Sequence, residues 1–254
     1  MGVIAITGAA GGIGQATRLR LERDGHRVIG VDVRDAEVIA DLSNADGRAA
    51  MVAAVSEHAG DGLDGLVAGA GIMDGEPASV VAINYFGAIA TLEGLRPLLA
   101  QRGGSAVAIS SNSATAQPSV SLDLVDACLT GDEAAAAATA AHYTGLTAYP
   151  ASKLALARWV RRQAPTWIKE GVRLNAIAPG LIRTPMTTES EEFILGLGDI
   201  YPIPIGRPGE ASEVAGLLAL LLSDEGRFFA GSVIFVDGGT DAALRPDDWP
   251  APLP

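Results

Sequence analysis

A short apolar run that ends abruptly in a glycine-rich turn constrains the fold more than any other feature of this chain. Residues 3–6 read Val-Ile-Ala-Ile, and glycines follow at positions 8, 12 and 14. Glycine lacks a Cβ atom, so it permits a sharp turn and close packing of a helix on its strand. The N-terminus of such a helix attracts phosphate. We therefore expect a phosphate-binding loop built on Gly8, Gly12 and Gly14, with a helix that begins near Gly12.

Composition favours one α/β domain over residues 1–254. The chain is 48% hydrophobic but only 5% aromatic, as is typical of parallel strands covered by helices on both faces. No Pro/Ser-rich linker divides it. We predict a single-domain, doubly wound parallel sheet of about seven strands, which routinely reaches this length as one unit.

Charge and cysteine content exclude several classes of function. The net charge of −12 argues against binding to nucleic acid or to an anionic membrane. Cys128 is the only cysteine, and His142 has no partner at metal-ligand spacing, so no disulfide framework or metal site is expected. We see no signal-peptide pattern and no apolar run near the ~20 residues that span a bilayer. A soluble cytoplasmic protein is expected.

A second apolar run ends at Asp32, 18 residues after Gly14. At this position a dinucleotide-binding fold holds the adenosine ribose hydroxyls, and a carboxylate there repels a 2′-phosphate. The alternative is a solvated turn aspartate. Asp41 and Leu42 follow the short run 38–40 and either border the adenine or only mark the end of that strand.

Two further strands end in residues suited to ligand binding. Ala70 and Gly71 follow the run 66–68, and small residues there leave room for a flat ligand. Ser111 follows the run 106–109, where such folds bind substrate, although paired serines also cap helices.

Two predicted helices carry polar residues that are candidates for hydrogen bonding or proton transfer. Asn84 lies inside the helix expected over 80–99, where asparagine is disfavoured unless it makes a hydrogen bond; a solvent-facing side chain is the alternative. Tyr149 and Lys153 share one face of a helix expected from Tyr149 to about Lys169, because residues four apart are neighbours. The ammonium would favour the ionised phenol, which then exchanges protons near neutral pH.

Together these residues resemble the short-chain dehydrogenase/reductase family. Its T-G-x-x-x-G-I-G pattern is met by Thr7, Gly8, Gly12, Ile13 and Gly14. Its Y-x-x-x-K pattern is met by Tyr149 and Lys153. The resemblance implies an NAD(H)-dependent enzyme that interconverts a secondary alcohol and a ketone. It implies that Tyr149 is the general acid and base, Lys153 lowers its pKa and binds the nicotinamide ribose, Ser111 orients the substrate oxygen, and Asn84 holds a relay water.

The resemblance also extends to later cofactor positions and has one departure. Pro179 and Gly180 resemble the turn after the sixth strand, and Ile182 and Thr184 would hold the nicotinamide carboxamide. The family's Asn-Asn-Ala-Gly is Ala-Gly-Ala-Gly at 68–71. This departure removes side-chain hydrogen bonds that stabilise the sheet but no catalytic group.

Ser111 and Tyr149 lie 38 positions apart, farther than is usual in the family, so residues 112–147 are predicted to be an insertion. Such an insertion recurs in the bacterial 3α-hydroxysteroid dehydrogenase/carbonyl reductases. The chain resembles that group also at residues 31–42, 84–87 and 237–241. Those enzymes interconvert 3α-hydroxysteroids and 3-oxosteroids with NAD(H) and reduce other carbonyl compounds.

Residues 187–206 are predicted to form a lid over a hydrophobic alcohol or ketone. The expected substrate contacts are Ser111, Tyr149, Met186, Phe193, Leu195 and Tyr201. Core packing explains the apolar members of this set equally well. A ketoreductase or diol dehydrogenase of the same fold would use the same catalytic residues, and an NAD(H)-binding sensor without turnover is the alternative from another class.

The resemblance also implies an oligomer. The family commonly associates through the two long helices expected over 80–99 and 149–169, and through the last strand and the helix before it. Because the insertion is expected to cover the first surface, we predict a homodimer through residues 211–222 and 232–236.

Overall fold

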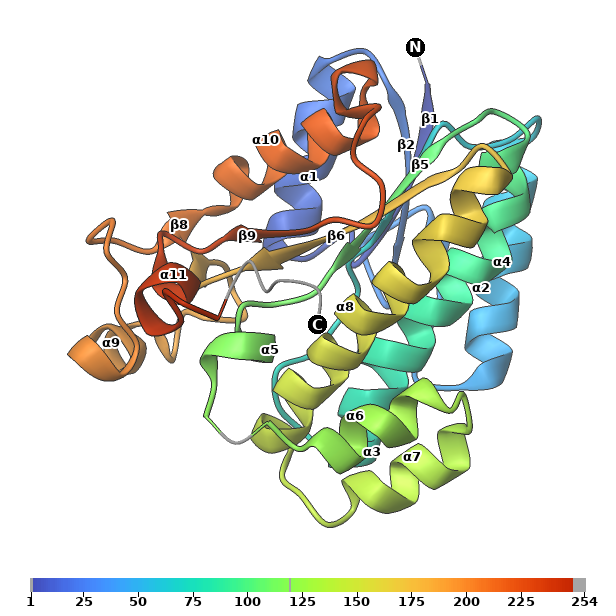
Figure 1. The fold of residues 1–254 in the computed structure, drawn as a ribbon. Helices are drawn as coiled ribbons and strands as arrows, with labels where there is room; N and C mark the ends of the chain where they lie inside the picture. The colour runs from blue at the N-terminus through green and yellow to red at the C-terminus, as the bar shows by residue number, and fades with distance from the viewer. Residues whose placement is uncertain (1, 119, 249–254) are drawn as a thin grey trace.

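Seven parallel strands form one sheet in the order β3-β2-β1-β4-β5-β6-β9 (Figure 1). The computed structural model describes residues 2–118 and 120–248. The strands are β1 (Val3–Thr7), β2 (Arg27–Asp32), β3 (Val38–Ile39), β4 (Gly65–Ala68), β5 (Ser105–Ile109), β6 (Arg173–Pro179) and β9 (Val233–Val236). The chain runs outward from β1 to β3 and returns to β4 on the other side of β1, which creates a switch point where ligands bind in such sheets. The predicted fold class is confirmed.

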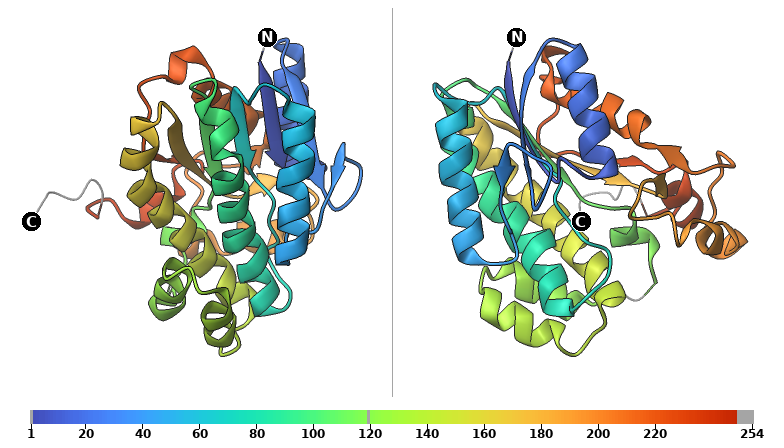
Figure 2. Two further views of the ribbon diagram at one scale, coloured as in Figure 1. Left: turned by 90° about the vertical axis from the view of Figure 1, so that its right-hand side faces the viewer. Right: turned by 180° about the vertical axis from the view of Figure 1, so that it is seen from behind.

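Helices cover both faces of the sheet, as the three views show (Figures 1 and 2). The helices on one face are α1 (Gly12–Arg23) and α10 (Ala211–Leu222), and those on the other are α2 (Ala45–Ala59), α4 (Ala88–Ala100) and α8 (Gly145–Lys169). Successive residues of a strand face opposite layers: Ile4 and Ile6 pack with the α1 side, whereas Ala5 packs with the α8 side. The strands are therefore apolar throughout.

Shorter elements surround the edge of the sheet where the strands end. They are β7 (Ile182–Arg183), which pairs with β8 (Gly209–Glu210), then α9 (Glu191–Leu195), α11 (Thr240–Leu244) and the 3₁₀ turn η2 (Gly198–Ile200). Another 3₁₀ turn, η3 (Asp224–Gly226), lies at the opposite edge, where Arg173 at the start of β6 donates to the carbonyl of Gly226 at 2.8 Å. The segment predicted as a lid contains α9 and η2.

The helix predicted over 80–99 is longer than expected and is not uniform. It runs through α3 (Pro77–Val81), a π-helical turn η1 (Ala82–Gly87) and α4. By length and composition alone, Pro77–Ala100 could cross a membrane, which the sequence analysis did not anticipate; 56% of its most apolar window is buried inside the protein. Its apolar character therefore largely reflects packing against the core, as in buried helices generally.

The inserted segment folds as three short helices. They are α5 (Ser113–Ala116), α6 (Leu122–Leu129) and α7 (Glu133–Ala140). Asp132 caps α7: its carboxylate accepts from the N–H of Ala135 at 3.0 Å. The insertion packs on α8 and α3 (Figure 1). The expected start of α8 at Tyr149 was wrong by four residues, because Thr144 caps the helix instead and its hydroxyl accepts from the N–H of Thr147.

Arg48 of α2 ties the insertion to the rest of the fold. Its guanidinium makes two hydrogen bonds of 2.6 Å to the Glu133 carboxylate, although only 8% of the Arg48 side chain is exposed. It also donates to the carbonyl oxygens of Leu42 at 2.8 Å and Ala82 at 3.1 Å. One buried cation thus joins the Leu42 loop, η1 and α7.

Replacing Arg48 by Met should lower the free energy of unfolding by about 2–4 kcal/mol, because a carboxylate and two carbonyl groups lose a charged donor. Urea denaturation measures the change. Arg227→Met is the matched control: Arg227 pairs with Asp224 at 3.5 Å on the surface with 72% of its side chain exposed, so its stability should match the wild type. An Arg48→Met protein as stable as this control would contradict the assignment.

Candidate active site

The loop after β1 has the close contacts that its glycines predict. Gly8 has φ +75°, and a Cβ atom at Gly14 would lie 2.0 Å from the carbonyl oxygen of Gly8. A Cβ atom at Gly12 would lie 2.6 Å from Cγ2 of Thr184. Because neither Gly12 nor Gly14 has a side chain, the N-terminus of α1 can lie directly over the end of β1 and against Thr184. Such a cradle suits a pyrophosphate group.

Thr7 supports this loop without lining the cleft. It is buried at the end of β1, and its hydroxyl accepts from the N–H groups of Gly69 at 3.1 Å and Ala70 at 3.3 Å. Thr7, the first residue of the glycine pattern and predicted to belong to the cofactor site, does not line the cleft. Its hydroxyl instead holds the Gly69–Gly71 turn after β4 against the end of β1.

Asp32 lies at the end of β2, where the sequence placed it. Its carboxylate accepts from the N–H groups of Ala10 at 3.0 Å and Val33 at 2.8 Å, and it borders the cleft. Asp41 lies nearby and accepts from the N–H of Ser43 at 2.9 Å, a hydrogen bond that lowers the pKa of Asp41. Arg34 also lines this end of the cleft.

One cleft of about 810 Å³ runs along the carboxyl ends of the strands. Most of the predicted site residues line it. They are Gly8, Gly12, Ile13, Gly14, Asp32, Asp41, Leu42, Ala70, Gly71, Ser111, Tyr149, Lys153, Pro179, Gly180, Ile182, Thr184, Met186, Phe193 and Tyr201. The cleft and its glycine cradle fit a dinucleotide, with a carboxylate at one end and hydroxyls at the other.

Lys153 is held at the end of β5. It is 4% exposed, its ammonium donates to the carbonyl oxygen of Ile109 at 2.9 Å, and it lies 5.7 Å from the centre of the Tyr149 ring. The hydroxyl of Ser110 donates to the backbone carbonyl of Lys153 at 2.8 Å. Burial lowers the pKa of Lys153 to about 8.

Tyr149 and Ser111 meet beside this ammonium. Tyr149 is half-buried and lines the cleft; this burial raises the pKa of Tyr149, and a hydrogen bond with Ser111 lowers it in part. The hydroxyl of Ser113 donates to that of Ser111 at 3.0 Å. In this arrangement the hydrogen bond with Ser111 favours the phenolate.

Asn84 is fully buried in η1 and does not line the cleft, so neither the solvent-facing alternative nor direct contact with a ligand holds. Its side chain accepts from the N–H of Ile72 at 2.9 Å and donates to the carbonyl of Ile72 at 2.9 Å and to the hydroxyl of Ser152 at 3.3 Å. A Cβ atom at Gly71 would lie 3.0 Å from its Oδ1 and 3.2 Å from Nζ of Lys153. Asn84 therefore fixes the segment after β4 next to Lys153.

A polar network that the sequence analysis missed anchors the lid. Asn112, 2% exposed, accepts from the hydroxyl of Tyr201 at 2.9 Å and donates to Asp237 at 3.3 Å. The Asp237 carboxylate also accepts from the N–H of Asp241 at 2.7 Å. Burial raises the pKa of Tyr201 to about 12, so its hydroxyl stays protonated as a donor. Only the place of Asn112 directly after a strand hinted at this role.

The outer wall of the cleft is apolar and comes from two segments. The lid supplies Phe193, which is 70% exposed, and the insertion supplies Leu146, which is 54% exposed. Gln117 and Pro118 of the insertion also line it. Leu195, also predicted to contact the substrate, lies in α9 but does not line the cleft.

Comparison with known proteins agrees with this geometry. The family model described as short chain dehydrogenase matches residues 38–122, and the one described as Enoyl-(Acyl carrier protein) reductase matches residues 131–241. The 3-alpha-hydroxysteroid dehydrogenase/carbonyl reductase of Comamonas testosteroni is 40% identical over 98% of this chain and 100% of that protein. The levodione reductase of Leifsonia aquatica is 30% identical over 95% of this chain and 94% of that protein.

A solved structure extends the likeness to three dimensions. The 3-alpha-hydroxysteroid dehydrogenase from Pseudomonas sp. B-0831, crystallised with NADH, superposes with a TM-score of 0.90 at 42% identity, over 96% of this chain and 99% of that chain. The glycine cradle, the Tyr149–Lys153 pair and these near full-length matches lead to one conclusion: the chain belongs to the short-chain dehydrogenase/reductase family of oxidoreductases.

Proposed function

We propose that this oxidoreductase uses NAD(H) to interconvert a secondary alcohol and a ketone, with 3α-hydroxysteroids and 3-oxosteroids as main substrates and a broader reduction of carbonyl compounds. The observation that carries the proposal is the meeting of Tyr149, Ser111 and Lys153 in the same cleft as the glycine loop. The steroid assignment draws support from the near full-length similarity to the Comamonas testosteroni enzyme.

The residues that would hold NAD(H) follow the cleft. The N-terminus of α1 receives the pyrophosphate, Asp32 accepts from the ribose hydroxyls, and Ile182 and Thr184 flank the nicotinamide end. When bound, the cofactor supplies the acceptor or donor of hydride. Lys153 is close enough to Tyr149 to contact both the ribose and the phenol.

The protein moves the proton that accompanies the hydride. In oxidation the Tyr149 phenolate removes the proton from the substrate hydroxyl, and in reduction the phenol returns a proton to the carbonyl oxygen. Ser111 donates to the same oxygen and stabilises the charge that develops on it. Asn84, held on Ile72, sets the place of Lys153 and of the water that we propose links it to solvent.

The apolar outer wall favours a large hydrophobic substrate. Phe193 and Ile200, each 70% exposed, and Met186, 48% exposed, border the cleft without a protein partner covering them. A steroid ring system would bury this surface and gain the corresponding hydrophobic free energy.

A panel of 3α-, 3β- and 17β-hydroxysteroids and small ketones tests the substrate, with Tyr149→Phe as the decisive variant. Turnover of 3α-hydroxysteroid should fall by about 10²–10⁴-fold in Tyr149→Phe, because general acid–base catalysis contributes that much. The dissociation constant of NADH should stay near the wild-type value in Tyr149→Phe. Lys153→Met should reduce both turnover and the affinity for NADH.

Tyr143→Phe is the matched control, since its hydroxyl bonds to Asp123 on the surface of the insertion, and it should keep full activity. Near-normal turnover by Tyr149→Phe would contradict the assignment of Tyr149 as the general acid and base. A protein that binds NADH but oxidises nothing in the panel would support a sensor instead, and preference for non-steroid ketones would support a ketoreductase.

The two reaction directions should depend on pH in opposite ways. Burial raises the pKa of Tyr149. As pH increases, the fraction of phenolate, which is the base in oxidation, rises, and the fraction of phenol, which is the acid in reduction, falls. We expect kcat/KM for oxidation to rise and for reduction to fall as pH increases through the phenol's pKa. Lys153, with a pKa of about 8, loses its charge at a lower pH than the one at which the phenol ionises. Parallel profiles in both directions would exclude Tyr149 as the shared group.

Asp32 should make the protein prefer NADH to NADPH by about tenfold or more, because a 2′-phosphate would face a carboxylate. Asp32→Asn keeps the acceptor for Ala10 but removes the charge, and it should narrow the ratio of the two dissociation constants. Asp35→Asn, three residues along and outside the cleft, should leave the ratio unchanged. If the wild type binds both cofactors equally, Arg34 becomes the candidate for a phosphate contact.

We further propose a homodimer through α10 and β9. β9 is an edge strand of the sheet whose four residues are half-buried, and Phe228 just before it is fully exposed. An exposed edge and an exposed aromatic side chain together mark a surface that favours a partner. The insertion packs on α3, η1 and α8 and so lies against the pair of long helices that the family resemblance implies for association.

Light scattering should show a dimer in the wild type and a shift toward monomer in Phe228→Glu. The exposed Leu19→Glu variant, 63% exposed on α1, is the control and should stay dimeric. A tetramer that persists on dilution would contradict the proposal.

A further inference from the structure

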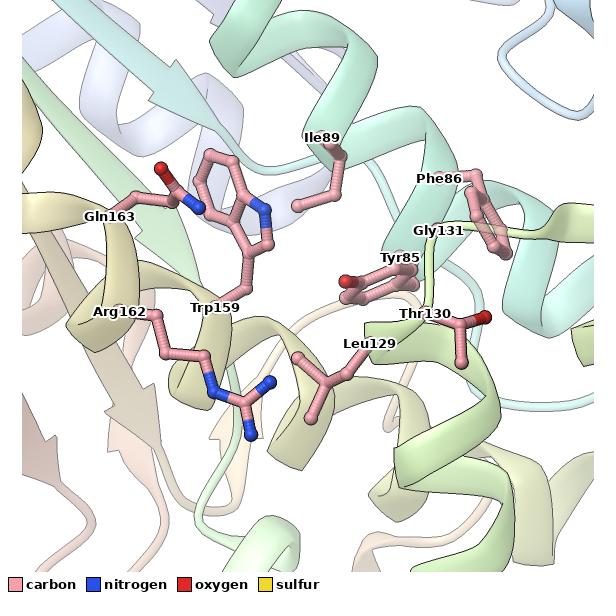
Figure 3. A pocket seen from close by; sticks show the side chains of 9 residues that line it. All are labelled: Tyr85, Phe86, Ile89, Leu129, Thr130, Gly131, Trp159, Arg162 and Gln163. Atoms are coloured by element: carbon pink, nitrogen blue, oxygen red, sulfur yellow. The ribbon is translucent and has the colours of Figure 1, made fainter.

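A second cavity, of about 340 Å³, lies outside the active-site cleft. It lies between the η1–α4 helix, the turn that joins α6 to α7, and the middle of α8 (Figure 3). Ile89, Leu129 and Trp159 give it an apolar wall, and polar groups come from Tyr85, Arg162 and Gln163. The insertion supplies one side of it, so the cavity depends on a feature that sets this chain apart within its family.

The Tyr85 hydroxyl is an unused donor in this cavity. Tyr85 is only 2% exposed, and its ring is fixed edge-on against Phe86 at 5.1 Å. Figure 3 shows its hydroxyl directed into the space beside Trp159 and Arg162. Within residues 2–118 and 120–248, no group makes a hydrogen bond to it. Burial also raises the pKa of Tyr85, so the hydroxyl remains a protonated donor that is open to the cavity.

Arg162 supplies a positive charge to the same cavity. Its charge acts on the Tyr85 phenol, and in the part of the chain that the structure describes no carboxylate pairs with it. Arg48 and Arg96, by contrast, each form an ion pair with a glutamate. An unpaired cation beside an unpaired donor, above an apolar floor, suits a carboxylate with an apolar body.

We propose that this cavity binds a small carboxylate with an aromatic or branched aliphatic body. The Tyr85 hydroxyl and the Arg162 guanidinium would hold the carboxylate, and the body would pack on Trp159 and Leu129. The volume is at the lower end of the ~300–1,000 Å³ range of small-molecule sites. Tyr85 directly follows Asn84 in η1, and Arg162 shares α8 with Lys153, so the site adjoins both helices that carry proposed active-site groups.

Phenylacetate is the probe, and the fluorescence of Trp159 is the reporter, measured without NADH. We expect saturable quenching, with a dissociation constant about tenfold higher for uncharged phenylacetamide, because hydrogen bonds to a charged group are lost. Tyr85→Phe and Arg162→Gln should each weaken phenylacetate binding by a similar factor. Arg161→Gln, next on the helix but outside the cavity, should bind as the wild type does. Circular dichroism checks that each variant is folded.

Equal affinity for the acid and the amide, or wild-type binding by both Tyr85→Phe and Arg162→Gln, would overturn the proposal. So would quenching that does not saturate. A dimer that Arg162→Glu dissociates, with no binding of phenylacetate, would mean that a second copy of the chain covers the cavity instead. The assay is independent of the enzymatic reaction: phenylacetate binding by a protein inactive on every steroid would refute the proposed function and leave this site standing.

Discussion

The close approach of α1 to the end of β1 is the constraint on which the site depends. The Gly8 carbonyl leaves no room for any side chain at position 14, so only glycine lets the helix begin there. The N-terminus of α1 consequently faces the edge where the parallel strands end. That edge also receives Asp32, Ser111 and Pro179, since every strand of the main sheet runs in the same direction. A single steric requirement thus aligns a positive dipole end with side chains from distant parts of the sequence.

Burial then sets the acid–base properties of the other end of the cleft. Desolvation lowers the pKa of Lys153 and raises that of Tyr149, because one loses a positive charge on deprotonation and the other gains a negative one. The carbonyl of Ile109 and the hydroxyl of Ser110 fix the lysine to β5. α8 is thereby locked to the sheet at the residues whose protons matter. The insertion, fastened by Arg48 to η1 and the Leu42 loop, packs over the same helix and borders both cavities.

The sequence determined most of the architecture and much of the cleft. Apolar runs separated by amphipathic segments predict a parallel α/β sheet, and the residues that follow each run, such as Asp32 and Ser111, must gather at one edge of it. The pairing of Tyr149 with Lys153 follows from helical geometry alone, because residues four apart share a face. The insertion was visible from spacing, and its Asp132 cap from local chemistry. All of these are properties of short segments or of the direction of strands.

Only the tertiary structure decided which side chains reach the cleft. Thr7 and Asn84 match the family pattern, yet they bond to Gly69 and Ile72 across 62 and 12 positions and lie behind the cleft wall. Asn112 and Asp237 are 125 positions apart, and no local pattern predicts that they meet. Leu195 belongs to the predicted lid but does not line the cleft. Thr7, Asn84 and Asn112 are positioned by hydrogen bonds to residues from other parts of the sequence. The place of Leu195 depends on how its short helix packs. Both are set only by the tertiary structure.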